Sequence, residues 1–353
     1  MSARTPAFVL GGSGYVAGEL LRLIAAHPRL AIAGVMSDSK PGAAVADAFP
    51  HLQPALAELL FTGVDEIGER LERCAESALF SAAPHGASAA LVDALLTRAQ
   101  RAGVTVHVVD CSADFRHARA EDYERIYVHE HGAPARLADF TCAVPEHLRD
   151  LRTPHVAHPG CFATAMLLAV VPLLASGLVA PRLYASGVTG STGSGRKPVE
   201  GTHHPRRHGD LYAYQPLAHR HAPEVVACAR AATGVEAELA FVPHSGPFAR
   251  GIYVTLQARL SRTAQAADVL DALGDYYAHS AFVRVQREPP RIKDVACSNY
   301  ARLSAAADGR TVAVSCVIDN LVKGAAGGAL QWMNRMLGLD EATGLTAPAP
   351  GWT

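Results

Sequence analysis

The sequence predicts a two-domain α/β protein, with an N-terminal doubly wound parallel sheet and a C-terminal α+β domain built on a mixed sheet. Three observations lead to this prediction. The chain has 353 residues, enough for two domains with separate cores. Residues 7–110 alternate short, continuously apolar runs with helical segments, as in a parallel sheet covered on both faces. After about residue 157, longer strands alternate apolar with polar residues.

The first half opens with a strand–helix–strand unit. Buried strands are expected where apolar residues run without interruption, and helices where Leu and Ile recur on one face. The strands are predicted at residues 7–11, 30–36, 77–83 and 105–110, and the helices at residues 15–27 and 87–101.

The second half has longer strands, in which apolar and polar residues alternate. Its strands are predicted at residues 182–188, 237–243, 251–260 and 311–319, and its helices at residues 264–278 and 325–337. A Gly-, Ser- and His-rich loop covers residues 187–210, and loops of this length in compact domains are usually functional or disordered. The later helices are too few to cover the apolar strands, so a homodimer built on this sheet is expected.

Composition excludes several classes of protein. The net charge is −1 and no Lys/Arg run occurs, so neither nucleic acid nor an anionic membrane is an expected partner. The longest apolar stretch, residues 163–174, contains Pro172 and is shorter than the ~20 residues of a membrane span. Seven cysteines without a Cys-x-x-Cys pair indicate reduced thiols in a cytoplasm. The 17 histidines match no zinc-ligand spacing, so no metal is predicted.

A glycine-rich turn joins the first strand to the first helix. It reads as G-x-G-x-x-A through Gly12, Gly14 and Ala17. Glycine is required where backbone N–H groups approach a pyrophosphate at a helix N-terminus. The turn therefore predicts a Rossmann-type dinucleotide site. The residues expected to bind the cofactor here are Gly12, Ser13, Gly14, Tyr15 and Val16.

The end of the second strand bears on the choice between NAD and NADP. An acidic residue there accepts hydrogen bonds from ribose hydroxyls, whereas a cation or hydroxyl suits a 2′-phosphate. The chain has Ser37, Asp38, Ser39 and Lys40 at this point, and so carries both signals. The residues alone leave the choice open.

Cys161 is the candidate nucleophile. It follows Pro159 and Gly160 and directly precedes a long apolar run, which places its thiol in the first turn of a buried helix. The N–H groups and positive dipole end of a helix favour thiolate over thiol. Together with a dinucleotide site, this thiol predicts redox chemistry on an acyl group through a thioester.

A thioester mechanism needs a group that titrates near neutral pH. His219 or His221 is the expected acid/base partner of Cys161, and Glu224 is expected to orient the imidazole or bind substrate. His203 and His204 belong to one of the densest histidine groups in the chain. The alternative to a metal-binding role for them is that they are ordinary surface histidines.

The segment after the fourth predicted strand is a candidate substrate site. Polar residues that follow a parallel strand lie at the carboxyl edge of the sheet. Here Arg116 is expected either to clamp a carboxylate or phosphate, or to form a surface ion pair with Asp114 or Glu121. Cys111 is the weaker candidate nucleophile, because it ends a buried strand and has no helix dipole.

Together these segments resemble the N-acetyl-γ-glutamyl-phosphate reductase family, the arginine-pathway branch of the aspartate-semialdehyde dehydrogenase superfamily. The resemblance spans almost the whole chain in family order, and Pro-Gly-Cys-Phe-Ala-Thr is a highly specific motif. The matching segments are residues 12–22, 83–86, 112–116, 143–146, 158–164, 219–224 and 318–327.

The resemblance implies NADPH-dependent reduction of N-acetyl-L-glutamyl 5-phosphate to the semialdehyde, with release of phosphate. Cys161 would carry the thioester, and His219, or less favourably His221, would act as acid/base. Asn320 would hold the nicotinamide end of the cofactor, and the loop at residues 189–195 would lie beside the substrate. Further cofactor contacts are expected from Ser37, Ser39, Lys40 and Pro84, and substrate contacts from Ser112, Arg116, Ser191, His221 and Glu224.

The same resemblance implies the domain organisation. An NADP-binding domain at residues 1–157 would be completed by a C-terminal helix at residues 324–345. Residues 158–323 would form the catalytic and dimerisation domain, and the assembly would be a homodimer or homotetramer.

Two other functions are open. A lysine-pathway relative reduces a carrier-protein-linked aminoadipyl phosphate, and Arg196, Lys197, Arg206 and Arg207 would supply a basic docking surface for such a carrier. A non-catalytic NADP-binding sensor is the second alternative. A paired cysteine and histidine disfavour it, because a sensor needs neither.

Overall fold

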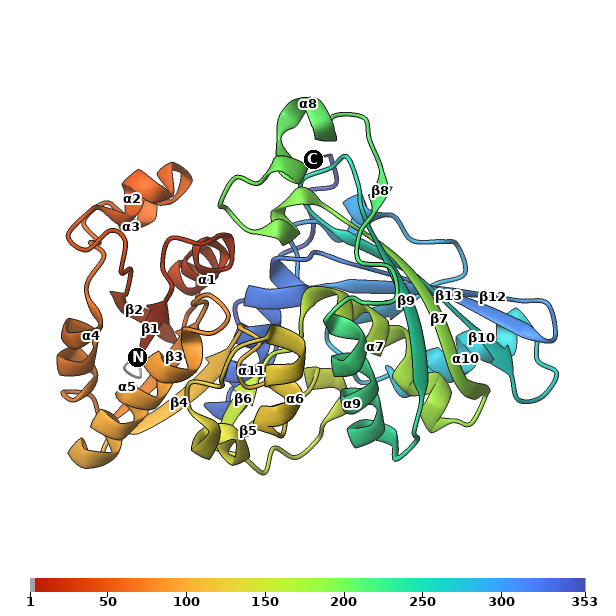
Figure 1. Cartoon of the computed structure of the whole chain (residues 1–353), viewed down its shortest axis with the longest axis horizontal. Helices are drawn as coiled ribbons and strands as arrows, with labels where there is room; N and C mark the ends of the chain where they lie inside the picture. The colour runs from red at the N-terminus through yellow and green to blue at the C-terminus, as the bar shows by residue number, and fades with distance from the viewer. Residues whose placement is uncertain (1–3, 353) are drawn as a thin grey trace. The chain divides into compact units, whose positions relative to one another are not determined.

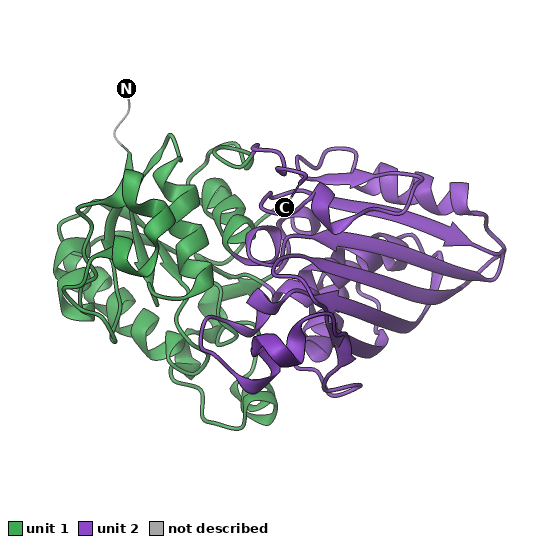
Figure 2. Cartoon of the chain, turned by 90° about the horizontal axis from the view of Figure 1, so that it is seen from above, with its two compact units in different colours: residues 1–142, 150–158, 326–345 green, residues 143–149, 159–325, 346–353 purple. Residues whose placement is uncertain are grey.

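The computed structural model describes residues 4–352 and divides into two compact units (Figure 2). The first unit comprises residues 4–142, 150–158 and 326–345, and the second comprises residues 143–149, 159–325 and 346–352. The boundaries expected from the sequence were 157/158 and 323/324. In the structure residues 143–149 group with the second unit, and the segment that returns to the first unit begins at residue 326.

The first unit is built on a six-stranded sheet in the order β2-β1-β3-β4-β6-β5, and every pair of neighbours is parallel (Figure 1). Its strands are β1 (Thr5–Leu10), β2 (Leu30–Val35), β3 (Glu76–Ser81), β4 (Thr105–Asp110), β5 (Phe140–Cys142) and β6 (His155–Ala157). β1 and β3 both lie between two other strands, and most of their residues are buried, as in a sheet covered on both faces.

Helices cover this sheet in two layers. α1 (Tyr15–Ala25) packs on α11 (Gly327–Met336), while α4 (Val64–Leu71) packs on α5 (Ser88–Ala102). The predicted doubly wound parallel sheet is therefore confirmed. The sequence did not predict β5, β6 or α6 (Ala120–Tyr127). Strands of three residues are too short to show a periodic pattern.

The second unit contains a seven-stranded mixed sheet in the order β11-β12-β13-β10-β7-β9-β8 (Figure 1). Its strands are β7 (Val179–Thr189), β8 (Tyr212–Ala213), β9 (Glu238–Ser245), β10 (Ile252–Leu260), β11 (Val283–Val285), β12 (Ala301–Ala307) and β13 (Thr311–Ile318). The β7–β9 and β11–β12 pairs are parallel and the other pairs are antiparallel. The prediction of a mixed second sheet is confirmed.

Three helices pack on this sheet. α7 (Cys161–Ala175) lies on β10 and β13, α9 (His221–Thr233) lies on β9 and α7, and α10 (Ala266–Tyr276) lies on β12. α7 is apolar around its whole circumference because it is enclosed by the sheet and by both other helices. It is the buried helix predicted to start at Cys161.

The strands of the second sheet alternate as half-buried strands do. On β7, Leu183 and Ala185 are buried, whereas Tyr184 between them is 49% exposed. One face of β7 therefore contributes to the core and the other carries side chains that are accessible in the single chain.

The segment at residues 187–210 differs from the predicted loop. Residues 187–189 complete β7, and the rest forms three short helical turns: η4 (Ser191–Ser194), η5 (Glu200–Thr202) and α8 (His204–Arg207). Buried Arg207 holds the segment, because its Nη1 donates to Ser245 Oγ at 2.5 Å and its Nη2 donates to the Gly246 carbonyl.

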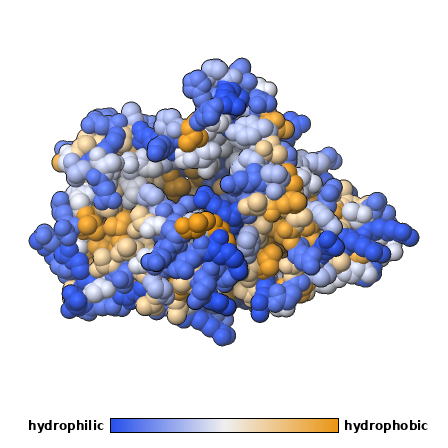
Figure 3. All heavy atoms as spheres, in the orientation of Figure 1, coloured by the Kyte–Doolittle hydropathy of each residue, from blue (hydrophilic) through white to orange (hydrophobic). Residues whose placement is uncertain are grey.

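Hydrophilic residues cover most of the face seen in Figure 3, and apolar residues appear there in separate small groups. Within residues 4–352, none of the helices combines the length and the apolar character needed to span a bilayer.

Candidate active site

Cys161 is the first residue of α7, with Gly160 as the N-cap in an extended conformation. The chain turns sharply there because Pro159 and Gly160 precede the apolar run. The thiol thus lies at the positive end of the helix dipole, beside backbone N–H groups of the first turn.

A carboxylate from α9 is bonded to this helix start. Glu224 Oε1 accepts a hydrogen bond from the Gly160 N–H at 2.6 Å, and Glu224 is fully buried. Glu224 thus contacts the backbone beside Cys161. Its expected role, to orient the imidazole or bind substrate, stays a prediction.

Cys161 opens onto a cavity of about 400 Å³ in the second unit. The cavity brings together Cys161, His219 and His221, which lie far apart in the sequence. None of its other lining residues was named as a candidate site residue: Phe162, Thr189, Gly193, Ser194, Tyr214, Gln215 and Arg220. Only Thr189, Gly193 and Ser194 belong to a segment that was expected beside the substrate.

His219 is enclosed by aromatic rings. Its ring centroid lies 5.8 Å from Phe162, 5.6 Å from Tyr214 and 5.4 Å from Phe241, each in an edge-on arrangement. Burial lowers the pKa of His219 to about 4, and the neighbouring Arg220 adds to the decrease. The imidazole is therefore neutral at physiological pH.

The tautomer of His219 follows from one hydrogen bond. The backbone N–H of His221 donates to His219 Nδ1 at 3.2 Å, so Nδ1 is the acceptor. In the neutral ring the proton then resides on Nε2. His221 begins α9, and its ring centroid lies 4.7 Å from that of His219.

Tyr214 is a second titratable group in the cavity. Burial raises the pKa of its phenol, and the nearby Cys161 raises it further. The hydroxyl therefore remains protonated and available as a donor at neutral pH.

Asn320 and Ser191 are bonded around the short turn η4, which also carries the lining residues Gly193 and Ser194. Asn320 Oδ1 accepts from the Gly251 N–H at 2.7 Å, and its Nδ2 donates to Thr192 Oγ1 at 3.0 Å. The Ser191 N–H donates to the Phe248 carbonyl at 2.9 Å. Asn320 thus braces the η4 turn, while its expected contact with nicotinamide stays a prediction.

In the first unit, the glycine turn has the shape that a dinucleotide site requires. Gly11 has φ +70°, and a Cβ on Gly12 would lie 2.5 Å from Val35 Cγ1 and 2.9 Å from the Met36 carbonyl oxygen. Both positions therefore require glycine. Gly11 was not part of the motif as read from the sequence, although it is the residue with positive φ.

The same turn contacts the end of β2. The Gly12 N–H donates to the Met36 carbonyl at 2.7 Å, which brings the following residue, Ser37, next to the turn. Ser37 Oγ lies 3.4 Å from Ser39 Oγ, and Ser39 and Lys40 are exposed. The predicted cofactor residues from both strand ends thus lie within one unit, around the N-terminus of α1.

The structure decides between the two expectations for Arg116. Its side chain is buried, with Nε donating to the His158 carbonyl at 3.0 Å and Nη2 donating to the Cys111 carbonyl at 2.8 Å. A surface position for Arg116, which the ion-pair expectation assumed, is therefore wrong. Glu121 pairs with Arg119 instead.

Asp114 and Ser112 are engaged in the same loop. Asp114 accepts hydrogen bonds from the Gly86 and Ala89 N–H groups. Ser112 Oγ donates to Asp110 Oδ2 at 2.6 Å. Burial raises the pKa of Asp110 to about 6.

Two further candidates are located in the first unit. Pro84 is exposed, and its carbonyl accepts from the Ala87 N–H at the start of α5. Burial raises the pKa of Cys111 to about 12, which leaves it a protonated, unreactive thiol. Among residues 4–352, no three His, Cys, Asp or Glu side chains are grouped as a metal site would require.

Comparison with known proteins first defines the class. Residues 7–152 match the family described as semialdehyde dehydrogenase, NAD binding domain, and residues 161–320 match the semialdehyde dehydrogenase dimerisation domain. Aspartate semialdehyde dehydrogenase II from Vibrio cholerae has the same fold, with TM-score 0.69 and 15% identity over 96% of this chain and 99% of that chain. The Candida albicans enzyme, solved with NADP, gives TM-score 0.61 and 14% identity over 95% of this chain and 99% of that chain. The chain therefore belongs to the semialdehyde dehydrogenase class.

Curated relatives narrow the class to one family. N-acetyl-gamma-glutamyl-phosphate reductase of Pseudomonas aeruginosa strain PAO1 is 39% identical over 350 residues, covering 97% of this chain and 98% of the relative. The Azotobacter vinelandii reductase is 38% identical over 348 residues, with 97% and 98% covered. The chain belongs to the N-acetyl-gamma-glutamyl-phosphate reductase family.

Proposed function

We propose that this protein reduces N-acetyl-L-glutamyl 5-phosphate to N-acetyl-L-glutamate 5-semialdehyde with NADPH, releasing phosphate, as a step of arginine biosynthesis. The observation that carries the proposal is the cavity shared by Cys161 and His219 at the N-terminus of α7. It occurs in a chain that is 39% identical to reductases of that name over nearly its whole length.

Cys161 is the nucleophile in this proposal. Its Sγ attacks the acyl carbon, the bond to the phosphate oxygen breaks, and phosphate leaves, so that a thioester remains on the protein. When bound, NADPH supplies the hydride that reduces this thioester. The resulting thiohemiacetal collapses to the semialdehyde and returns the thiol. The helix N-terminus favours the thiolate as both attacking and leaving group.

His219 is the acid/base group. Because Nδ1 accepts the His221 N–H, proton exchange takes place at Nε2, which donates to the oxygen on the acyl carbon. The aromatic rings around His219 exclude water and keep the imidazole neutral. His221 and Ser191 are assigned to substrate binding, with Ser112 and Arg116 of the first unit as further candidates.

The residues of the first unit fit a dinucleotide. α1 begins at Tyr15 and its N-cap residue, Gly14, has no side chain to cap it, so the first N–H groups of the helix are directed at the space ahead of it. We assign Gly12, Ser13, Gly14, Tyr15 and Val16 to the pyrophosphate region. Ser37, Ser39 and Lys40 are assigned to the 2′-phosphate, and Pro84 and Asn320 to the nicotinamide end.

The assignment also covers assembly and location. The first unit is the NADP-binding domain, and the second is the catalytic and dimerisation domain of at least a homodimer. We expect the enzyme in the cytoplasm, where its thiols remain reduced.

Two of the four cations expected to form a docking surface for a carrier protein disfavour the carrier-linked alternative. Arg207 is buried and bonded to Ser245, and Arg206 pairs with Glu200, so neither offers an uncommitted charge to an acidic carrier.

Turnover of an acyl phosphate tests the proposal. The purified protein should oxidise NADPH in the presence of N-acetylglutamyl phosphate and not with a carrier-linked aminoadipyl phosphate. Cys161→Ser should bind NADPH as the wild type does and lose nearly all turnover, since a hydroxyl is a far weaker nucleophile than a thiolate. Substantial activity in Cys161→Ser would exclude the thioester mechanism. Cofactor binding without turnover of either substrate would favour the sensor.

A further inference from the structure

Gly324 lies directly against Cys161. A Cβ on Gly324 would lie 2.7 Å from Cys161 Cβ, 3.0 Å from Cys161 Cα and 3.3 Å from Ile318 Cδ1. Real Cβ atoms essentially never approach another atom to 2.7 Å, and the Cα at 3.0 Å belongs to the backbone of α7, which cannot rotate away. Residue 324 thus determines how closely the chain after β13 approaches the nucleophile.

A buried ion pair holds the residue next to Gly324. Lys323 is fully buried, and its Nζ lies 2.6 Å from Glu146 Oε1, which is also buried. The same ammonium lies 5.6 Å from the centre of the Phe282 ring. Because neither charge reaches solvent, movement of Lys323 away from Glu146 would leave a buried charge without its counter-ion.

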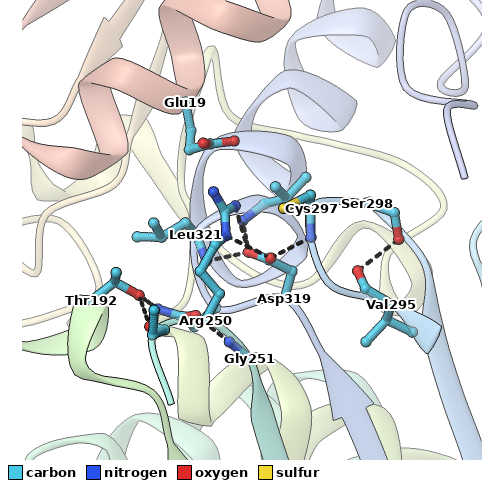
Figure 4. Close-up of polar contacts among 12 residues, drawn as sticks. Glu19, Thr192, Arg250, Gly251, Val295, Cys297, Ser298, Asp319 and Leu321 are labelled. Atoms are coloured by element: carbon cyan, nitrogen blue, oxygen red, sulfur yellow. Dashed lines mark hydrogen bonds and ion pairs between the residues drawn. The ribbon is translucent and has the colours of Figure 1, made fainter. Parts of the chain in front are cut away.

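Asp319 holds the other end of the same turn (Figure 4). Its carboxylate accepts the N–H groups of Leu321 and Val322, both at 2.8 Å, and its carbonyl accepts the Gly324 N–H at 3.0 Å. Arg250 binds the same carboxylate through two nitrogens at 2.9 and 3.0 Å. The turn that leads to Gly324 is therefore fixed at both ends.

The turn that carries Glu146 is also tied to α7. The neighbouring His147 Nε2 lies 2.9 Å from the Tyr277 hydroxyl, which donates to the Leu168 carbonyl of α7 at 2.7 Å. The three-residue turn η3 (Pro145–His147) thus connects the chain around Gly324 with the middle of the nucleophile helix.

We propose that Gly324, held by the Lys323–Glu146 ion pair, is a positioning residue that sets the location of the Cys161 thiol for attack. This inference rests on the proposed role of Cys161. The ion pair itself does not line the cavity, so it acts through the backbone of residues 323–324.

The decisive variant is Gly324→Ala, which adds the Cβ that would collide with Cys161. A displacement of the nucleophile of the order of 1 Å should lower kcat by about 10- to 100-fold. The KM for NADPH should be unchanged, and the rate of Cys161 alkylation by iodoacetamide, localised by mass spectrometry, should change. Gly274→Ala in α10 is the matched control, because its added Cβ meets no atom within 4 Å. It should retain wild-type kcat and alkylation rate.

Glu146→Gln tests the ion pair. It keeps the shape of the side chain but removes the charge that holds Lys323, so kcat and the alkylation rate should shift in the same direction as in Gly324→Ala, by a smaller factor. Glu121→Gln removes one partner of the exposed Arg119–Glu121 pair and should leave both quantities unchanged.

Wild-type kcat and alkylation rate in Gly324→Ala would overturn the proposal, even if the variant melts at a lower temperature. If Gly324→Ala does not fold, the substitution is made in a Cys161→Gly background, which removes the colliding Cβ. Folding of this double variant supports the contact, and its failure to fold, when Cys161→Gly alone folds, overturns the proposal. The alkylation and stability measurements need no turnover, so they still test the positioning if the wild type fails to reduce the acyl phosphate.

Discussion

Glu224 Oε1 accepts a hydrogen bond from the Gly160 N–H at 2.6 Å, so a fully buried carboxylate on α9 is joined to the start of α7. A negative charge at this end of a helix also interacts favourably with the helix dipole. The contact joins the two helices that supply Cys161 and His221. The buried carboxylate thus has a hydrogen-bond donor at the helix start beside Cys161.

Glu224→Ala should lower the free energy of unfolding. The substitution leaves the buried Gly160 N–H without this acceptor, and such a group costs about 1–3 kcal/mol. Glu224→Gln retains an acceptor oxygen and should lose less. Urea denaturation measures both, with the exposed Glu236→Gln as control. Equal stability of Glu224→Ala and wild type would show that water replaces the carboxylate.

His219→Asn should reduce kcat about 10²–10⁴-fold, the usual contribution of general acid/base catalysis. Because burial lowers the pKa of His219 to about 4, the wild-type rate should not decline through pH 6.5 on account of this group. A pH profile of kcat/KM measures this. If His221→Asn is crippled while His219→Asn is nearly normal, the acid/base assignment moves to His221 and the thioester mechanism is retained.

The free energy of unfolding should decrease as the pH falls from about 6.5 towards 4. This interval lies between the ordinary pKa of a histidine and the lowered pKa values of three histidines in this protein. Burial lowers the pKa of His147, His155 and His219 to about 4, so the unfolded chain binds more protons than the folded chain in this window. Asp110 has the opposite effect. Because its pKa is raised to about 6, the folded chain binds this proton more readily than the unfolded chain, which increases the free energy of unfolding as the pH falls. The urea concentrations at the midpoint of unfolding at pH 7, 5.5 and 4.5 show whether the histidines or Asp110 have the larger effect. His155→Phe should flatten the dependence, and an unchanged slope would remove His155 from the explanation.

Lys40→Ala should weaken NADPH binding and spare NADH. Lys40 is exposed a few residues after the end of β2, and a lost charge-assisted contact with the 2′-phosphate costs about 1.5–3 kcal/mol. Fluorescence titration with both cofactors measures the difference. Equal losses for NADPH and NADH would place Lys40 away from the 2′-phosphate.

The protein should be at least a dimer at micromolar concentration, assembled through the second sheet. Tyr184 is 49% exposed on a strand in the middle of that sheet, where an interface would bury it. Tyr184→Glu should therefore shift the mass measured by light scattering towards the monomer. A monomeric wild type would refute the prediction, and a dimeric Tyr184→Glu would move the interface elsewhere.

Local chemistry allowed much of the fold to be read directly. The continuous apolar runs of β1 to β4 can only be buried in a covered sheet, and the turn at Gly12 and Gly14 is typical of a strand that leads into a helix. Pro159 and Gly160 before an apolar run likewise locate the start of α7, and with it Cys161. Each of these features depends on neighbours within one or two turns of chain.

The short elements were missed for the same reason. β5, β6 and β11 have three residues each, and their strand conformation comes from pairing with distant strands, not from their own side chains. Arg116 shows that the contacts of a single side chain also depend on residues brought close by folding. Its sequence neighbours suggested a surface ion pair, whereas folding brings the carbonyls of Cys111 and His158 within reach of its guanidinium.

The sequence by itself determined the class of fold, the place of Cys161 at the start of a buried helix and the position of the glycine turn, because backbone preference and hydrophobic periodicity act locally. Only the tertiary structure decided what surrounds the thiol: the Glu224 carboxylate at Gly160, the aromatic rings around His219, and Gly324 against Cys161. These contacts join residues remote in the chain, and they exist because close packing of α7, α9 and the turn after β13 leaves room for one arrangement of side chains.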